Sequence, residues 1–267
     1  GMSAPDMEKI DRVSRKPYGM VLSTGPTGSG KSTSLYAILN AINKPDINIM
    51  TLEDPVEYRI NNIRQIQLNR KAGMTFAGGL RSILRQDPDV IMVGEIRDAE
   101  TAAISVQAAQ TGHRVLSTVH TNDAAGAISR FIDMGIEPFL ISSVLLVSFG
   151  QRLVRMVCPY CKEPYSPSEK SYAALGITPD EAKTADFQRG KGCYQCKNTG
   201  YKGRTGIFEV LINDEMVQEM ILKKKSSLEI TRAAVEAGNM QTLQKDAARK
   251  VLRGITTLEE AVTSVMT

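Results

Sequence analysis

The chain has 267 residues, of which 42% are hydrophobic and 23% charged, and its formal net charge is +4. This composition is typical of a globular protein with a sizeable core, and so small a positive charge neither supports nor excludes a nucleic-acid partner. The longest apolar run, residues 139–149, is interrupted by serines and is too short to cross a bilayer. We therefore expect neither a membrane span nor a targeting segment in this chain.

A complete phosphate-binding loop follows the apolar run of residues 20–22 and precedes a helix-like stretch, residues 34–39. The loop reads Gly25-Pro26-Thr27-Gly28-Ser29-Gly30-Lys31-Ser32-Thr33. Glycines let backbone N–H groups wrap around phosphates, and a helix N-terminus favours anions. In such loops the lysine, here Lys31, reaches the β- and γ-phosphates, and the next hydroxyl, here Ser32, ligates Mg²⁺. The sequence therefore predicts a binding site for a nucleoside triphosphate.

The first half of the chain alternates strand-like with helix-like segments. Strands are expected at residues 47–52, 65–69, 90–94 and 115–120. Helices are expected at residues 75–86, after the capping residue Asp98, and at residues 123–134. The wholly apolar run 90–94 is typical of a central strand that is buried on both faces. This order predicts an α/β fold with a mainly parallel sheet covered by helices on both sides.

Acidic residues follow two of the expected strands, at the end where ligands bind in open α/β sheets. Glu95 comes directly after the run 90–94, where a carboxylate can contact Mg²⁺ through water, although an acid in this place can also cap the next helix. Glu53 and Glu57 lie on either side of the bend at Asp54-Pro55. One of them could hold and deprotonate an attacking water, and a solvated turn is the alternative.

The only two histidines, His113 and His120, flank the expected strand 115–120. Their positions differ by an odd number, so a regular strand would place them on opposite faces. His120 follows the carboxyl end of the strand and could sense a γ-phosphate, whereas His113 lies at the other end and could report on a neighbouring segment. Arg81 and Arg85 share one helix face and could oppose phosphate charge or form an exposed basic surface.

After residue 151 the pattern changes. Residues 157–204 are rich in Pro, Gly, Cys, Lys and Tyr, which indicates a small loop-rich insert, and from Phe208 the chain is expected to be helical again. Capping signals occur at Asn213-Asp214 and Ser226-Ser227, and Thr257 to Glu260 has the spacing of a capping box.

The four cysteines form two Cys-x-x-Cys pairs, at Cys158 and Cys161 and at Cys193 and Cys196. Two such knuckles suit a tetrahedral thiolate site for Zn²⁺, and a long linker adds little closure entropy. Two disulfides are the alternative, which a cytosolic type of ATP site disfavours. Because the insert is poor in apolar residues, the metal is expected to supply much of its stability.

Taken in order, these motifs resemble those of the type II secretion and type IV pilus assembly ATPases. The resemblance covers essentially the whole chain. Its segments are Gly25–Thr33 (Walker A), Thr51–Glu57 (Asp box), Val90–Arg97 (Walker B), Thr111–Thr121 (His box), Gln151–Val154, the cysteine pairs and Gly203–Leu211.

The resemblance implies a RecA-like P-loop core at residues 1–154, a tetracysteine zinc insert at 155–204 and a C-terminal helical region at 205–267. It identifies Glu57 as the catalytic glutamate, Glu95 as the Walker B acid, and His113 and His120 as His-box residues. It further implies ATP hydrolysis between the subunits of a homo-hexameric ring, with ATP, Mg²⁺ and Zn²⁺ bound. The N-terminal domains of the family are expected to precede this segment.

The same resemblance implies a cytoplasmic motor that works at the inner membrane through a platform protein, with no nucleic-acid partner. The cysteine insert is similar to that of assembly and secretion motors. Type II secretion and pilus assembly are not distinguished by it. Two alternatives are a small-molecule kinase, which would need an acceptor pocket and an arginine lid, and a nucleic-acid motor. Lysines and arginines around the cysteines, residues 191–204, favour the latter, but they lack an interleaved aromatic array.

Overall fold

The computed structural model describes residues 1–266 and divides the chain into two compact units. The sheet unit comprises residues 3–150 and 210–240. The cysteine unit comprises residues 1–2, 151–209 and the residues from 241 onward. The C-terminal residues are thus shared between the units, whereas the sequence suggests one segment at 205–267. The division into three domains stays a prediction about the natural protein.

The sheet unit is built on strands in the order β3-β2-β4-β5-β1-β6-β9. The ladders β3–β2, β2–β4, β4–β5, β5–β1 and β1–β6 are all parallel. The strand bounds are β1 Gly19–Thr24, β2 Ile49–Glu53, β3 Arg64–Gln67, β4 Val90–Val93, β5 Arg114–Val119, β6 Leu145–Val157 and β9 Tyr201–Ile212. Because the paired strands run parallel, the loops at their carboxyl ends meet at one edge of the sheet.

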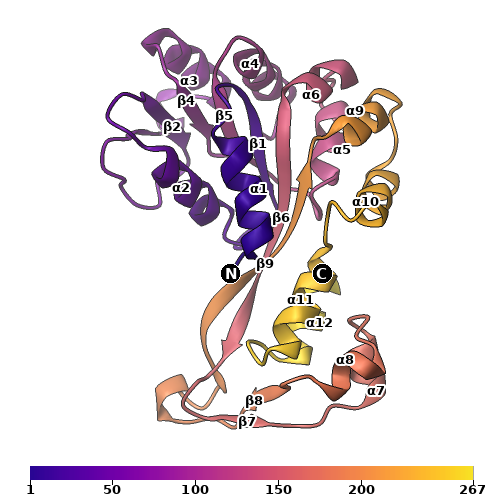
Figure 1. The fold of residues 1–267 in the computed structure, drawn as a ribbon. Coiled ribbons are helices and arrows are strands. Elements are labelled where there is room, and N and C mark those ends of the chain that lie inside the picture. Colours follow the sequence, from indigo (N-terminus) through magenta and orange to yellow (C-terminus); the bar gives the residue numbers. More distant parts are fainter. Residues whose placement is uncertain (267) are drawn as a thin grey trace. The chain divides into compact units, whose positions relative to one another are not determined.

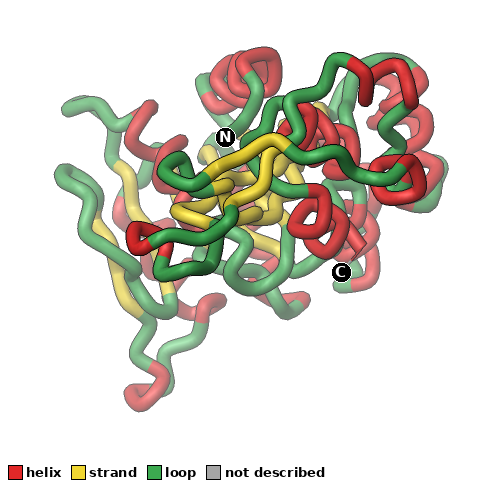
Figure 2. The backbone as a smooth tube through the Cα atoms, turned by 90° about the horizontal axis from the view of Figure 1, so that it is seen from below, coloured by secondary structure: helices red, strands yellow, loops and turns green. Residues whose placement is uncertain are grey.

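Helices cover both faces of this sheet (Figures 1 and 2). Their bounds are α1 Ala4–Ser14, α2 Lys31–Ile42, α3 Phe76–Ile83, α4 Ala99–Gln110, α5 Gly126–Asp133, α6 Pro138–Val144, α9 Glu215–Leu222 and α10 Ser227–Glu236. Successive residues of a strand face opposite sides of the sheet, and in β4 the residues on both sides are buried. Ile91 and Val93 belong to the core with α3 and α4, and Val90, on the other side, is likewise inaccessible to solvent. The expected α/β fold is confirmed.

The helical stretch expected from Phe208 begins later in the structure. Residues 207–211 are buried and belong to β9, which ends at Ile212. Asp214 then caps α9 by accepting a hydrogen bond from the Val217 N–H, as its capping signal predicts. The run expected as helix 75–86 is α3 followed by one 3₁₀ turn at Leu84–Gln86.

The cysteine unit has a core of its own, formed by Val154, Leu175, Ile177, Phe187, Ile207 and residues of the two C-terminal helices. Its elements are the antiparallel pair β7 (Lys162–Pro164) and β8 (Gln188–Gly190), with α7 (Glu169–Ala173), α8 (Pro179–Lys183), α11 (Leu243–Leu252) and α12 (Leu258–Met266). The region expected to be loop-rich therefore holds short helices and strands, and Leu175, Ile177 and Phe187 pack against α11 and α12.

A buried ionic cluster fixes α11 within this unit. The carboxylate of Asp246, whose side chain is 2% exposed, accepts hydrogen bonds from the Phe208 N–H at 2.9 Å and from Lys250 Nζ at 2.5 Å. Arg249 also contacts it. Lys250 is itself almost fully enclosed, so its ammonium depends on Asp246 for a counter-charge.

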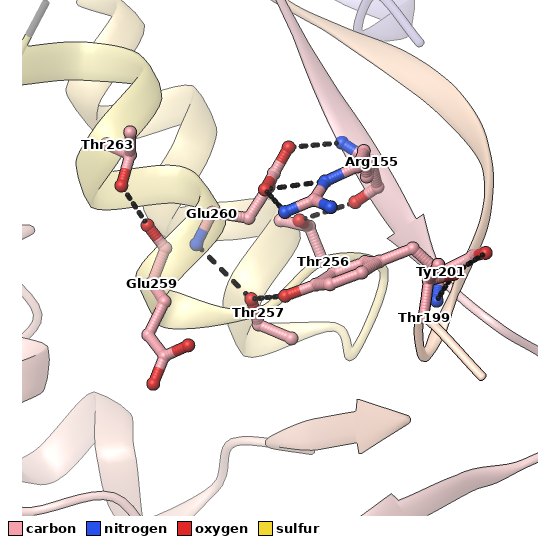
Figure 3. A network of polar contacts seen from close by, with 8 residues as sticks. All are labelled: Arg155, Thr199, Tyr201, Thr256, Thr257, Glu259, Glu260 and Thr263. Carbon is pink, nitrogen blue, oxygen red and sulfur yellow. Dashed lines mark hydrogen bonds and ion pairs between the residues drawn. The ribbon is translucent and has the colours of Figure 1, made fainter. Parts of the chain in front are cut away.

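A second network attaches α12 to strands β6 and β9 (Figure 3). Arg155 donates to Glu260 from Nε at 2.9 Å and from its terminal nitrogen at 2.6 Å, and its guanidinium lies 4.1 Å from the ring centre of Tyr201. The Tyr201 and Thr257 hydroxyls are 2.8 Å apart. Thr257 accepts the Glu260 N–H, as a capping box requires, but the Glu260 carboxylate bonds to Arg155 on β6. The predicted box is therefore only half formed.

Candidate nucleotide-binding site and cysteine cluster

The phosphate-binding loop lies between β1 and α2, where the sequence predicts it. Gly28 and Gly30 have φ angles of 78° and 89°, a backbone region that side-chain-bearing residues rarely adopt. Gly30 is the N-cap of α2, and because it has no side chain, nothing from the cap residue covers the first-turn N–H groups. A helix end of this form presents backbone donors and the positive end of the helix dipole to an anion.

Lys31 begins α2, and its side chain turns back over the loop. Its Nζ donates hydrogen bonds to the carbonyl oxygens of Gly25 at 2.7 Å and Pro26 at 2.8 Å. The residue is 8% exposed. Two carbonyl oxygens of the loop thus hold the Lys31 ammonium beside it. From this position the ammonium can reach an anion that is bound to the loop's N–H groups.

The two glutamates of the Asp box have different environments. Glu53, at the end of β2, is 2% exposed, and its carboxylate accepts hydrogen bonds from Tyr36, from Thr51 at 2.5 Å and from Gln65 at 3.2 Å. Glu57 lies four residues further along, in the loop after the cis peptide bond Asp54-Pro55, and its side chain is exposed. Of the two carboxylates, that of Glu57 is therefore the one open to solvent, and its role as catalytic base stays a prediction.

Glu95 follows β4, and its carboxylate contacts one positively charged and one ionisable side chain. Its carboxylate lies 2.6 Å from an Arg97 nitrogen and 3.5 Å from His120 Nε2. Burial, and then the nearby charge of Lys31, lower the pKa of His120 below its ordinary value. The imidazole is therefore neutral at neutral pH, so it can exchange hydrogen bonds with an anion without adding a charge.

These residues surround one pocket of about 210 Å³ in the sheet unit. Parallel pairing explains the convergence, because β1, β2, β4 and β5 end at the same edge of the sheet. The lining residues are Thr27, Gly28, Lys31, Ser32, Glu53, Asp54, Pro55, Glu57, Phe76, Met92, Gly94, Glu95, Arg97, Thr118 and His120. The pocket thus brings together the predicted phosphate loop, both candidate carboxylate sites and one of the two histidines.

Other candidate residues lie elsewhere. His113 precedes β5, at the opposite end from His120, and its Nδ1 is 3.0 Å from the Ala108 carbonyl at the end of α4. The structure does not bring it into the pocket, and its catalytic assignment stays a prediction. Arg81 forms an exposed ion pair with Glu100 on α4, which favours the surface alternative for this arginine.

Arg97, Tyr36 and Gln65 belong to the site region but were not singled out by the sequence. Arg97 is separated from Glu95 by one residue, so the sequence shows that the two are close but not where the Arg97 side chain points. Tyr36 reads as an ordinary buried position of a helix, and Gln65 as the polar residue of an alternating strand. Only the fold shows that both contact the buried Glu53.

The four cysteines converge as predicted. Their Sγ atoms all lie within 4.8 Å of one another, with Cys158–Cys193 at 3.9 Å and Cys161–Cys196 at 3.8 Å. Four sulfurs about 2.3 Å from a tetrahedrally coordinated zinc would be separated by about 3.8 Å. The sulfur geometry therefore fits this metal and excludes disulfides, since no pair is at bonding distance.

The protein environment favours a thiolate at one of these positions. Burial alone would raise the pKa of Cys196, but hydrogen bonds from the N–H groups of Cys193 and Gly200 help to lower it to about 6. The knuckles also need small residues, because a Cβ on Gly190 would lie 2.1 Å from the Gly200 carbonyl oxygen. The Gly200 carbonyl, which follows the second knuckle, also accepts the Cys158 N–H of the first at 2.9 Å.

A family model described as "Type II/IV secretion system protein" matches residues 1–263. The chain belongs to this family. Among curated relatives, the type II secretion system protein E of Pseudomonas aeruginosa is 53% identical over 98% of this chain and 51% of its own length. The type IV pilus assembly ATPase PilB of Thermus thermophilus is 50% identical over 98% of this chain and 29% of its own length.

Solved structures of secretion-family proteins resemble the fold. The pilus retraction motor PilT with bound ADP has a TM-score of 0.71 at 28% identity, covering 98% of this chain and 64% of PilT. The ATPase DotB of Legionella pneumophila has a TM-score of 0.68 at 26% identity, covering 98% of this chain and 62% of DotB. The predicted family and P-loop fold are confirmed. The chain spans about half the length of the type II relatives it matches.

Within residues 1–266, none of the helices combines the length and the apolar character that crossing a bilayer requires.

Proposed function

We propose that this chain is the ATP-hydrolysing part of a motor that powers pilus or pseudopilus assembly and type II protein secretion. Its membership of the secretion family supports this function. The observation that carries the proposal is the single pocket in which the phosphate loop, Glu57, Glu95 and His120 meet. Such a set supplies phosphate binding, a base and a magnesium partner, which are the parts that phosphoryl transfer to water requires.

Gly25 to Thr33 hold the triphosphate through backbone N–H groups, and Lys31 exchanges its two carbonyl partners for phosphate oxygens. Ser32 and Glu95 would hold Mg²⁺, Ser32 directly and Glu95 through water. The ion, when bound, neutralises charge on the phosphate oxygens. Arg97, the ion-pair partner of Glu95, also lines the pocket, from where its guanidinium can turn toward the phosphates.

Glu57 orients the attacking water and accepts its proton. The water oxygen forms a bond to the γ-phosphorus while the bond from that phosphorus to the bridging oxygen breaks, so ADP and inorganic phosphate leave. His120, which is neutral and exposed at the pocket edge, donates a hydrogen bond to the γ-phosphate. Because its Nε2 lies 3.5 Å from Glu95, His120 couples binding of the γ-phosphate to the position of Glu95.

The cysteine cluster holds one Zn²⁺ through Cys158, Cys161, Cys193 and Cys196. All four ligands come from protein thiolates, which is the arrangement of structural rather than catalytic zinc sites. The ion would join the two knuckles, with no part in the hydrolysis.

The active form is a homo-hexamer in which each pocket lies at a subunit boundary. Exposure of Glu57 on a single subunit supports this arrangement, because a neighbouring subunit can cover it and exclude bulk water. The ring acts in the cytoplasm, at the inner membrane, on a platform protein of the secretion or pilus machine. Rotations of rigid units during hydrolysis supply the mechanical work.

Glu57→Gln tests the proposal, with Glu100→Gln on α4 as the matched control. The glutamine variant should bind ATP with unchanged affinity and lose about 10²–10⁴-fold in turnover, because the base is removed while the phosphate contacts remain. Phosphate release and binding of a fluorescent ATP analogue measure the two quantities. Turnover at the wild-type rate would refute Glu57 as the base. Stimulation of hydrolysis by DNA, lost at high salt, would favour a nucleic-acid motor over a secretion motor.

A further inference from the structure

The loop that carries Glu57 is exposed at its side chains but fixed along its backbone. The Glu57 N–H donates a hydrogen bond to the Tyr36 hydroxyl at 3.4 Å. The side-chain amide of Gln65 on β3 binds the backbone just after Glu57. Its Nε2 donates to the Tyr58 carbonyl at 3.0 Å, and its Oε1 accepts the Ile60 N–H at 2.7 Å. Two buried side chains therefore fix the backbone on either side of an exposed carboxylate.

Both of these side chains rest on Glu53. Its carboxylate accepts hydrogen bonds from the Tyr36 hydroxyl, from Gln65 Nε2 at 3.2 Å and from Thr51 Oγ1 at 2.5 Å. Gln65 Nε2 also lies 3.4 Å from the Tyr36 oxygen. Because these donors use both carboxylate oxygens, Glu53 acts as an anchor inside the fold, although it borders the pocket.

Tyr36 joins this network to the phosphate loop. It belongs to α2, the helix that starts at Lys31, and its ring is fully buried with an edge-on contact to Tyr58 at 4.7 Å. Burial, followed by the hydrogen bond and charge of Glu53, raises the pKa of Tyr36 well above its ordinary value. The hydroxyl therefore keeps its proton, donates a hydrogen bond to the Glu53 carboxylate and accepts one from the Glu57 N–H.

We propose that Tyr36 and Gln65, anchored on Glu53, are positioning residues that hold Glu57 in place for proton abstraction. This inference rests on the proposed function, in which Glu57 accepts the proton of water. Neither residue needs to touch a reactant. Their effect is to keep a loop carboxylate in one place, since a misplacement of about 1 Å can cost about 10²-fold in rate.

Tyr36→Phe in the complete natural protein removes one hydroxyl and keeps the ring contact with Tyr58. Turnover should fall about 10- to 100-fold, while the affinity for a fluorescent ATP analogue stays within about twofold. Tyr18→Phe is the matched control, because it removes the hydroxyl of an exposed tyrosine in the same unit. Turnover of Tyr36→Phe at the wild-type rate would overturn the proposal.

Gln65→Met is a second variant, of similar shape, that keeps the test valid if Tyr36→Phe folds poorly. It should show the same division, with lower turnover and unchanged nucleotide affinity. Loss of affinity in proportion to turnover in both variants would indicate general damage to the pocket and would contradict a positioning role.

A double-mutant cycle with Glu57→Gln separates positioning from stability. If Tyr36 acts through Glu57, adding Tyr36→Phe to Glu57→Gln lowers the residual turnover by less than about twofold. An equal fold-loss in both backgrounds would show that Tyr36 acts independently of Glu57. If Glu57→Gln alone keeps the wild-type turnover, Glu57 is not the base that the proposed function requires, and the positioning role is refuted as well. That outcome is read from the single variant and is distinct from a failure of Tyr36→Phe.

Discussion

Asp246→Asn tests the buried ionic cluster of the cysteine unit. The variant keeps the shape of the side chain but removes the negative charge that faces Lys250 at 2.5 Å. Lys250 is 6% exposed at its side chain, so its ammonium would be left in the core with a neutral amide. Removing one partner of a buried ion pair costs about 3–5 kcal/mol, and we expect a loss in this range.

Native-state hydrogen exchange of the α11 amides, together with urea unfolding, measures this loss. Lys250→Met should cost less, about 1–2 kcal/mol, because Asp246 keeps Arg249 and the Phe208 N–H as partners. Asp180→Asn, at a position that is 89% exposed, is the control and should leave exchange unchanged.

The pH dependence gives a second criterion. Burial already lowers the pKa of Lys250 against the opposing effect of Asp246, and loss of that carboxylate lowers it further. A lysine with a depressed folded-state pKa destabilises most at low pH, and the penalty shrinks as pH rises toward the unfolded pKa of about 10.4. The deficit of Asp246→Asn should therefore diminish at alkaline pH. A loss below about 1 kcal/mol, or one independent of pH, would refute a buried ammonium as its cause.

Three further predictions concern the remaining sites. Lys31→Ala should weaken nucleotide binding at least about tenfold in calorimetric titrations, since it removes a charged phosphate contact, and unchanged affinity would argue against the phosphate-loop assignment. Metal analysis should find about one zinc per chain, and a chelator should remove exchange protection around Cys158 and Cys196; a stable metal-free protein would contradict a structural zinc. Burial opposes ionisation of Glu260, but its hydrogen bonds with Arg155 lower the Glu260 pKa overall. The contact therefore stabilises the fold above the unfolded pKa of about 4.3, and this stabilisation is lost as the pH falls through the lower folded pKa. Acid titrations of Glu260→Gln should lack this component of the unfolding free energy, and an unchanged acid transition would refute it.

The nucleotide pocket could be predicted largely because its signals are local. The phosphate loop, Glu95 and His120 each follow a strand whose apolar pattern is visible in the sequence, and parallel pairing brings strand ends together. Such reasoning does not need the angle of any side chain. It therefore gives the members of the pocket but not the contacts among them, such as the ion pair of Glu95 with Arg97.

Other features depend on partners far away in the chain. Spacing alone does not decide between Glu53 and Glu57. The difference arises from Tyr36 and Gln65, whose side chains donate hydrogen bonds to the carboxylate of Glu53. The half-formed capping box at Thr257 has the same origin. Its local pattern is correct, but Arg155, more than a hundred residues earlier, offers Glu260 its guanidinium and its own backbone N–H in place of the Thr257 N–H.

The two compact units are interleaved along the chain, and this has a consequence for synthesis on the ribosome. The sheet unit lacks residues 210–240 until residues 151–209 of the cysteine unit have been made, and the core of the cysteine unit lacks α11 and α12 until the whole sheet unit has been made. Neither unit can thus finish folding before the other is largely synthesised. The apolar faces of Leu175, Ile177 and Phe187 are exposed during that interval, when an early metal ion on the knuckles would limit misfolding by holding nearby loops together.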